Sequence, residues 1–97
     1  MKILINYLTD KSNLKIEILD QEFLVNGKKA MVDVNGFVRK LLKIVSIWEE
    51  NMVNNLIVGG DHYEVKIKDG DMVYNYVGYG KYPINYHEFV ALIGGLE

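Results

Sequence analysis

Residues 14–32 read LKIEILDQEFLVNGKKAMV, and this stretch decides the fold class of the 97-residue chain. From Leu14 to Ile18, apolar residues alternate with charged ones, which is the period of a strand with one buried face. Asn26-Gly27 then separates two runs rich in β-forming residues, 22–25 and 28–32. Because Asn and Gly tolerate the positive φ angles that a type I′ turn requires, this pair predicts a tight antiparallel hairpin.

More strands are predicted on both sides of this stretch. Residues 2–8 are mostly β-formers, and residues 62–68 and 71–77 flank Asp69-Gly70, for which we predict a second type I′ turn. That turn would pair Ile67 with Met72. It would also place six side chains on one apolar face: Tyr63, Val65, Ile67, Met72, Tyr74 and Tyr76.

A long helix is predicted from about Val34 to Met52, with Asp33 as its N-cap. Apolar residues recur there at the spacing of one helical face: Val34, Phe37, Val38, Leu41, Val45, Trp48 and Met52. Residues 56–58 form a candidate short strand after it.

A short helix is predicted at about residues 86–93, and Phe89, Leu92 and Ile93 are expected to face the core. Asn85 and Glu88 stand at the spacing of a capping box. Ile84 precedes this cap at the position of a hydrophobic staple with Phe89.

The strands and helices are segregated along the chain, which favours an α+β fold with an antiparallel sheet. We expect about five to seven strands, with one long and one short helix packed on one face. The expected order is β-β-β-β-α-(β)-β-β-α. Residues 1–97 are predicted to form a single domain, because the 49% hydrophobic and 25% charged fractions are ordinary globular values.

Composition argues against several functions. The chain has no cysteine, so it has no disulfide, thiolate nucleophile or thiolate metal site. Neither His62 nor His87 has a second ligand at metal-site spacing, and no catalytic constellation or cofactor motif is evident. No apolar run approaches the length of a membrane span, so we expect a cytoplasmic protein. The lysine- and asparagine-rich composition suggests a bacterial or phage source.

The segment Gly78-Tyr79-Gly80-Lys81-Tyr82 is the strongest functional candidate. It fails the phosphate-loop pattern, because that pattern needs an earlier glycine and a Ser or Thr after the lysine. Tyrosines beside glycines are instead typical of contact surfaces. We therefore predict a non-catalytic protein that docks onto a protein partner, as an inhibitor, immunity or accessory protein. His62 and Glu64 lie on the adjoining polar face of their strand and complete the predicted site.

Three alternative interactions remain open at this level. The first is nucleic-acid binding through a basic cluster: Lys28, Lys29, Arg39, Lys40 and Lys43. The second is a small-ligand pocket or an enzyme site between the last helix and the sheet, lined by Tyr63, Tyr74 and Tyr76. The third is a homodimer formed by pairing at a sheet edge, for which residues 2–8 are the candidate strand.

Overall fold

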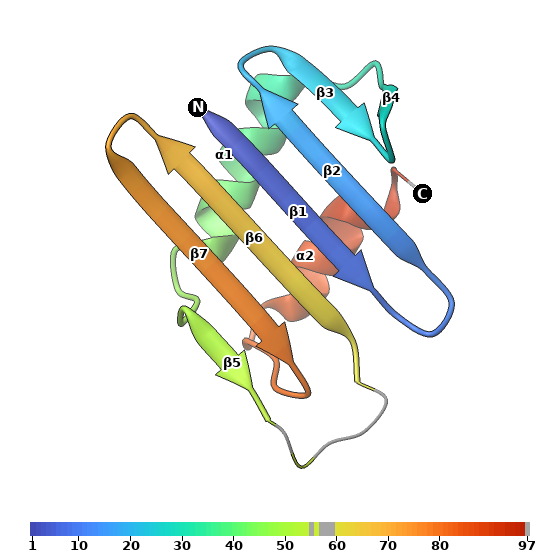
Figure 1. Ribbon diagram of the computed structural model, residues 1–97, viewed down its shortest axis with the longest axis vertical. Helices are drawn as coiled ribbons and strands as arrows, with labels where there is room; N and C mark the ends of the chain where they lie inside the picture. The colour runs from blue at the N-terminus through green and yellow to red at the C-terminus, as the bar shows by residue number, and fades with distance from the viewer. Residues whose placement is uncertain (55, 57–59, 97) are drawn as a thin grey trace.

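The computed structural model describes residues 1–54, 56 and 60–96, and within them the chain forms one seven-stranded sheet with two helices on one of its faces (Figure 1). The elements are β1 (Lys2–Leu8), β2 (Asn13–Leu19), β3 (Glu22–Val25), β4 (Lys28–Lys29), α1 (Val34–Val45), β5 (Asn51–Val53), β6 (His62–Asp69), β7 (Met72–Tyr79) and α2 (Tyr86–Gly94). Their order across the sheet is β4-β3-β2-β1-β6-β7-β5. The pairs are antiparallel except that β5 runs parallel to β7. The predicted α+β class is confirmed.

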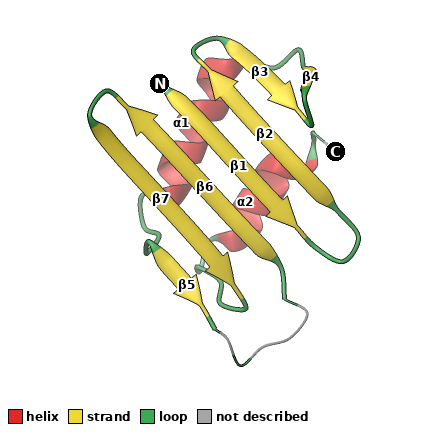
Figure 2. Ribbon diagram, viewed as in Figure 1, coloured by secondary structure: helices red, strands yellow, loops and turns green. Residues whose placement is uncertain are grey.

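The core lies between the sheet and the two helices, which Figure 2 shows on the same side of the strands. Alternate residues of the central strands point into it, and Ile5, Ile16 and Val65 are completely buried there. The helices contribute Leu41 from α1 and Phe89 from α2. The opposite face of the sheet carries no helix, so we call it the open face.

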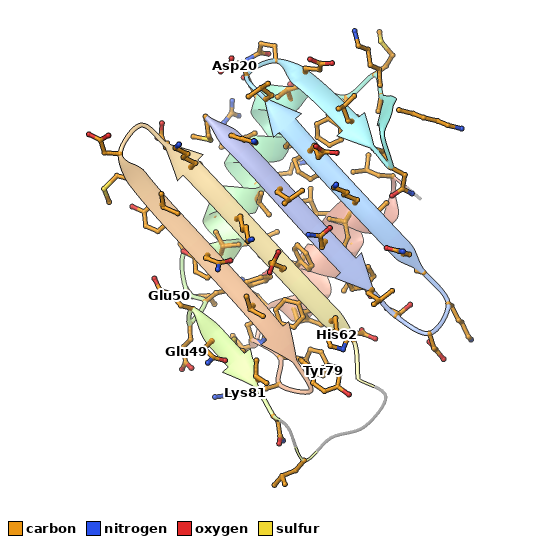
Figure 3. The ribbon with its side chains drawn as sticks, in the orientation of Figure 1. Asp20, Glu49, Glu50, His62, Tyr79 and Lys81 are labelled. Atoms are coloured by element: carbon orange, nitrogen blue, oxygen red, sulfur yellow. The ribbon has the colours of Figure 1, made fainter. Side chains whose placement is uncertain are left out.

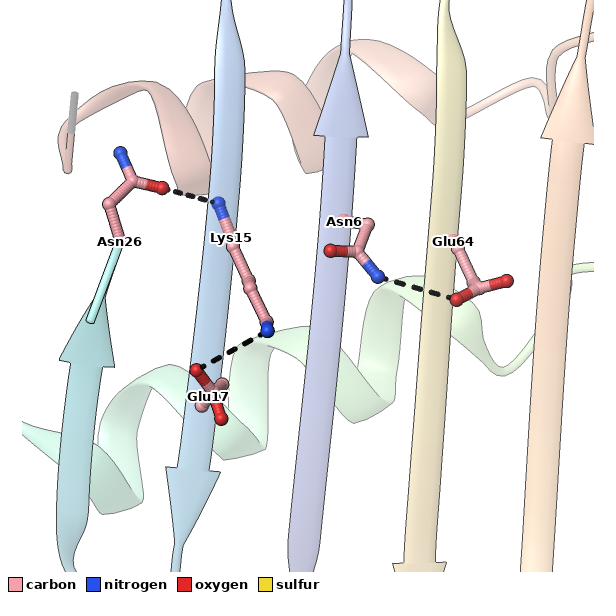
Figure 4. Close-up of polar contacts among 5 residues, drawn as sticks. All are labelled: Asn6, Lys15, Glu17, Asn26 and Glu64. Atoms are coloured by element: carbon pink, nitrogen blue, oxygen red, sulfur yellow. Dashed lines mark hydrogen bonds and ion pairs between the residues drawn. The ribbon is translucent and has the colours of Figure 1, made fainter.

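The first hairpin forms as predicted. Asn26 and Gly27 both have positive φ, at 50° and 81°, as a type I′ turn requires. The Asn26 side chain also accepts a hydrogen bond from the Lys15 backbone N–H at 2.8 Å, which ties the hairpin to β2 (Figure 4). The predicted strand 28–32 is shorter than expected, because only Lys28–Lys29 pair with β3.

The second hairpin has its register displaced by two residues from the prediction. Its loop is Gly70-Asp71, and only Gly70 has positive φ, which matches a type II′ turn with glycine at its first central position. Ile67 therefore faces Tyr74 and not Met72. Since a strand has a period of two residues, this displacement leaves every side chain on its predicted face.

The long helix ends earlier than predicted. Asp33 caps it through a hydrogen bond from Gly36 N, as expected, but α1 stops at Val45. Trp48 and Met52 are buried, although Trp48 lies in the connection after the helix and Met52 lies in β5. If the helix continued, Glu49 and Glu50 would interact unfavourably with the helix dipole near its C-terminus. The chain instead forms β5, whose backbone pairs with β7.

Three smaller predictions were wrong. Strand β1 pairs on both sides, with β2 and β6, so residues 2–8 leave no open edge. Asn85 makes no side-chain cap bond for α2, and Ile84 is 90% exposed, so neither the capping box nor the staple forms.

The candidate strand 56–58 lies mostly outside the described residues. No helix in the described part of the chain is long and apolar enough to cross a membrane.

Candidate binding surface

The predicted segment Gly78–Tyr82 is divided between two sides of the molecule. Tyr79 ends β7 on the open face and stands opposite His62 of β6. Their rings stack with centroids 4.1 Å apart and planes 24° apart, and both side chains lie at the lower end of the sheet in Figure 3. Glu64 follows His62 on the same face, so the structure brings these three predicted residues together.

Gly78 faces the helices and has a structural role. The ring of Tyr63, its partner on β6, lies directly over it, so that a Cβ atom at position 78 would overlap the ring. The Tyr63 hydroxyl continues past Gly78 and donates a hydrogen bond of 2.7 Å to the Lys81 carbonyl oxygen. The absence of a side chain at Gly78 therefore allows the tyrosine to close this end of the core.

Gly80 turns the chain away from the open face with a φ of 69°. Lys81 then places its Nζ 3.6 Å from Glu49 Oε2, an exposed ion pair that contributes little stability (Figure 3). The Tyr82 hydroxyl accepts a hydrogen bond from Asp61 N, and its ring packs 4.6 Å from that of Tyr86. Lys81 and Tyr82 thus close the end of the molecule beside α2.

Asp61 organises the hydroxyl groups at this end. Its carboxylate accepts hydrogen bonds from Tyr86 Oη at 3.0 Å and from Tyr7 Oη at 3.4 Å. Burial is the largest cause of the raised pKa of Tyr86. The hydrogen bond between Tyr86 and Tyr7 and the nearby Asp61 carboxylate raise this pKa further. Burial and the adjacent Tyr82 raise the pKa of Tyr63 from 10.0 to about 12. This cluster was not predicted from the sequence, because its members come from four separate segments.

The raised pKa of Tyr63 predicts a loss of stability at high pH. Above pH 10 the unfolded chain loses this proton while the folded chain keeps it, so the stabilisation present below pH 10 is lost as the pH rises towards 12. The free energy of unfolding should fall with a limiting slope of about 1.4 kcal/mol per pH unit for this tyrosine. Urea denaturation across this range should show a shallower slope for Tyr63→Phe. An identical slope in both proteins would contradict this assignment.

The open face continues from the His62–Tyr79 pair across the central strands. Glu64 accepts a hydrogen bond of 3.4 Å from Asn6, and Lys15 pairs with Glu17 at 3.8 Å (Figure 4). Lys66 Nζ lies 3.7 Å from the Glu64 carboxylate. Several large apolar residues also lie exposed on this face: Leu8, Leu19 and Val73. The surface therefore combines polar pairs with uncovered apolar area.

A lysine patch lies at the other end of the open face and was not predicted. It consists of Lys2 on β1 with Lys66 and Lys68 on β6. These lysines surround a shallow hollow of about 410 Å³ that Leu4, Val73 and Asn75 also line. The alternation of β6 predicts that Lys66 and Lys68 share a face, but their meeting with Lys2 depends on the long-range pairing of β1 with β6.

Strand β7 has an uncovered edge beside this patch. The short β5 pairs only with Val77, Gly78 and Tyr79, which leaves the outer edge of residues 72–76 without a neighbouring strand among the described residues. Met72, Val73 and Tyr74 are 56%, 65% and 39% exposed. Tyr74, which the sequence places on the predicted apolar face, therefore lies outside the core. Tyr76 is half-buried, with its ring 6.1 Å from that of Trp48.

The predicted basic cluster is spread over two elements. Arg39, Lys40 and Lys43 are exposed on α1 and line a groove that α2 borders with Leu92. Lys28 and Lys29 lie on the edge strand β4, where Lys29 Nζ is 3.9 Å from Glu22.

Comparisons of the chain with protein-family models, curated proteins and solved structures found no match.

Proposed function

We propose that this chain is a small non-catalytic binding protein that docks onto a protein partner through the open face of its sheet. One observation carries the proposal: both helices cover the same face of the sheet, while the other face presents aromatic and apolar side chains beside an uncovered strand edge. Such mixed surfaces are typical of interfaces, where a few aromatic anchors dominate the binding energy. An inhibitor, immunity or accessory protein of bacterial or phage origin would work in this way. The cytoplasmic location expected from the sequence stays a prediction.

The stacked pair of Tyr79 and His62 is the proposed anchor. Both side chains come from paired strands of the sheet, so the backbone beneath them is already ordered before a partner arrives. Preorganisation of this kind lowers the entropic cost of binding. Glu64 lies next to the pair on the same face, whereas Lys81 and Tyr82 bind other residues at the end of the molecule beside α2.

Loss of the anchor should weaken partner binding. The partner would be captured from an extract of the source organism with tagged protein, identified, purified and titrated against variants. His62→Ala/Tyr79→Ala should weaken its affinity at least about tenfold, because aromatic anchors at interface centres contribute more than their neighbours. The matched control is Ile84→Ala/His87→Ala, which removes one exposed apolar side chain and one histidine at the start of α2. Unchanged affinity in the first variant, or equal loss in the control, would contradict the proposal.

The small-ligand alternative receives no support from the packing. Tyr63 is 2% exposed, and its ring contacts those of Trp48, Tyr82 and Tyr86, so side chains fill the space where a ligand was expected. Tyr74 is 39% exposed and is not among the rings that contact Tyr63.

A further inference from the structure

The lysine patch holds positive charges in an arrangement that costs stability. In the pairing of β1 with β6, Lys2 stands directly opposite Lys68, and Lys66 stands opposite Leu4. Like charges at directly opposed positions destabilise a sheet. Lys66 has Glu64 at 3.7 Å, but neither Lys2 nor Lys68 forms an ion pair within the described residues. Because the whole chain has a net charge of −2, this positive patch is a local feature.

The uncovered edge of β7 offers backbone groups next to these charges. Val77 N donates outward, away from β6, to Glu50 O. Since strand N–H groups alternate in direction, the N–H groups of Asn75 and Val73 point the same way. No described residue pairs with them. They are therefore available to an additional strand, which is how many domains bind extended peptides.

We propose that the lysine patch and the β7 edge together bind an extended, acidic segment of the partner protein. This inference rests on the proposed docking function and names the chemistry of the partner. A strand added to β7 would lie about 10 Å from β6, and alternate side chains would stand beside Val73 and Asn75 on the open face. Carboxylates at those positions lie within reach of the long side chains of Lys66 and Lys68. The exposed apolar surface of Val73 would be covered at the same time.

A nucleic acid fits this site less well. Single-stranded nucleic acids are held by basic grooves that also present aromatic rings for base stacking. The hollow among the lysines is lined by Leu4, Val73 and Asn75 and contains no aromatic side chain. The nearest aromatic pair on the open face, His62 and Tyr79, lies at the other end of the strands. An unpaired strand edge also matches a peptide backbone and not a phosphodiester one.

Binding of defined probes tests the inference directly. Fluorescence anisotropy at low salt would follow a labelled peptide of about ten residues with alternating Glu and Val, long enough to form one strand. The same titration would use an alternating Lys and Val peptide and a thymidine oligonucleotide. We expect binding of the acidic peptide alone, weakened by salt. Binding should fall at least about tenfold in Lys2→Glu/Lys68→Glu.

The matched control is Lys40→Glu/Lys43→Glu, which changes the net charge equally but lies on α1. This variant should bind the peptide with an affinity within about twofold of that of the wild type, because Lys40 and Lys43 lie on the helix side of the sheet. Asn75→Pro removes an outward N–H from an edge strand, so it should weaken peptide binding without unfolding the protein. Lys68→Glu alone places a carboxylate opposite Lys2, so it should raise the melting temperature of the protein while weakening its binding of the peptide.

Four outcomes would overturn the inference: no binding of the acidic peptide, equal loss in the α1 control, undiminished binding in Lys2→Glu/Lys68→Glu, or preferred binding of the oligonucleotide. None of these bears on whether a captured protein partner depends on His62 and Tyr79. If one of these outcomes occurs but the captured partner still depends on His62 and Tyr79, this inference fails and the proposed docking face is unaffected. Peptide binding combined with a captured partner insensitive to His62→Ala/Tyr79→Ala would instead contradict the proposed anchor.

Discussion

Gly78→Ala should destabilise the protein by about 3 kcal/mol, at the upper end of the usual cost of overpacking a core. The added Cβ would overlap the ring of Tyr63, and that ring has little freedom to move. Trp48, Tyr86 and Phe89 contact it, and its hydroxyl is bound to Lys81 O. Urea denaturation of the variant and the wild type would give the difference in the free energy of unfolding.

The same substitution at Gly94 provides the control. Gly94 lies in α2 with no atom within 4 Å of an added Cβ, so Gly94→Ala should stabilise the protein by about 0.5–1 kcal/mol through helix propensity. A double-mutant cycle adds a second check, because Gly78→Ala should cost far less in a Tyr63→Val background. A cost below 1 kcal/mol for Gly78→Ala in the wild-type background, which is about the smallest expected for overpacking, would contradict the packing described.

Asn85→Ala should also cost about 3 kcal/mol, because it leaves two buried polar groups without partners. Asn85 Oδ1 accepts a hydrogen bond of 2.7 Å from Trp48 Nε1, and its Nδ2 donates one of 2.9 Å to Ile44 O. Ile44 O belongs to the last turn of α1, where carbonyl groups lack helical donors. This one side chain therefore joins the end of α1, the following connection and the start of α2.

Two variants separate this role from a general effect of substitution. Trp48→Phe keeps most of the ring packing but removes the donor, so it should cost about 1–3 kcal/mol. Asn35→Ala, at an exposed position of α1, should change stability by no more than about 0.5 kcal/mol. If thermal and urea denaturation showed Asn85→Ala to be as stable as Asn35→Ala, the network would not have the role assigned to it.

The local features of the fold were predictable from short patterns, and their limits have physical causes. The Asn26-Gly27 hairpin formed because its turn needs only those two residues and the β-formers beside them. The turn at Gly70-Asp71 was displaced because Asp-Gly and Gly-Asp both satisfy hairpin turns of different types, and they overlap in this sequence. Trp48 and Met52 fit a helical period by coincidence, since both are buried for reasons of tertiary packing.

The candidate surface shows the same division between local and long-range information. Strand alternation was enough to place His62 and Glu64 on one face, and the hairpin brought Tyr79 to them. The lysine patch required the pairing of β1 with β6, which are far apart in the sequence and linked by no turn motif. The role of Asn85 was mistaken because a residue that can cap a helix can equally bind a buried indole, and only tertiary contact decides between them.

Chemical protection of the open face tests the docking proposal most directly. The chain contains no cysteine, so single cysteines can be introduced as the only reactive thiols, at Leu8→Cys opposite His62 on the open face and at His87→Cys on α2. Alkylation rates would be measured with and without the purified partner. We expect the partner to slow alkylation at Leu8→Cys and to leave His87→Cys unchanged. Protection at His87→Cys with free alkylation at Leu8→Cys would place the interface on the helices and contradict the docking proposal.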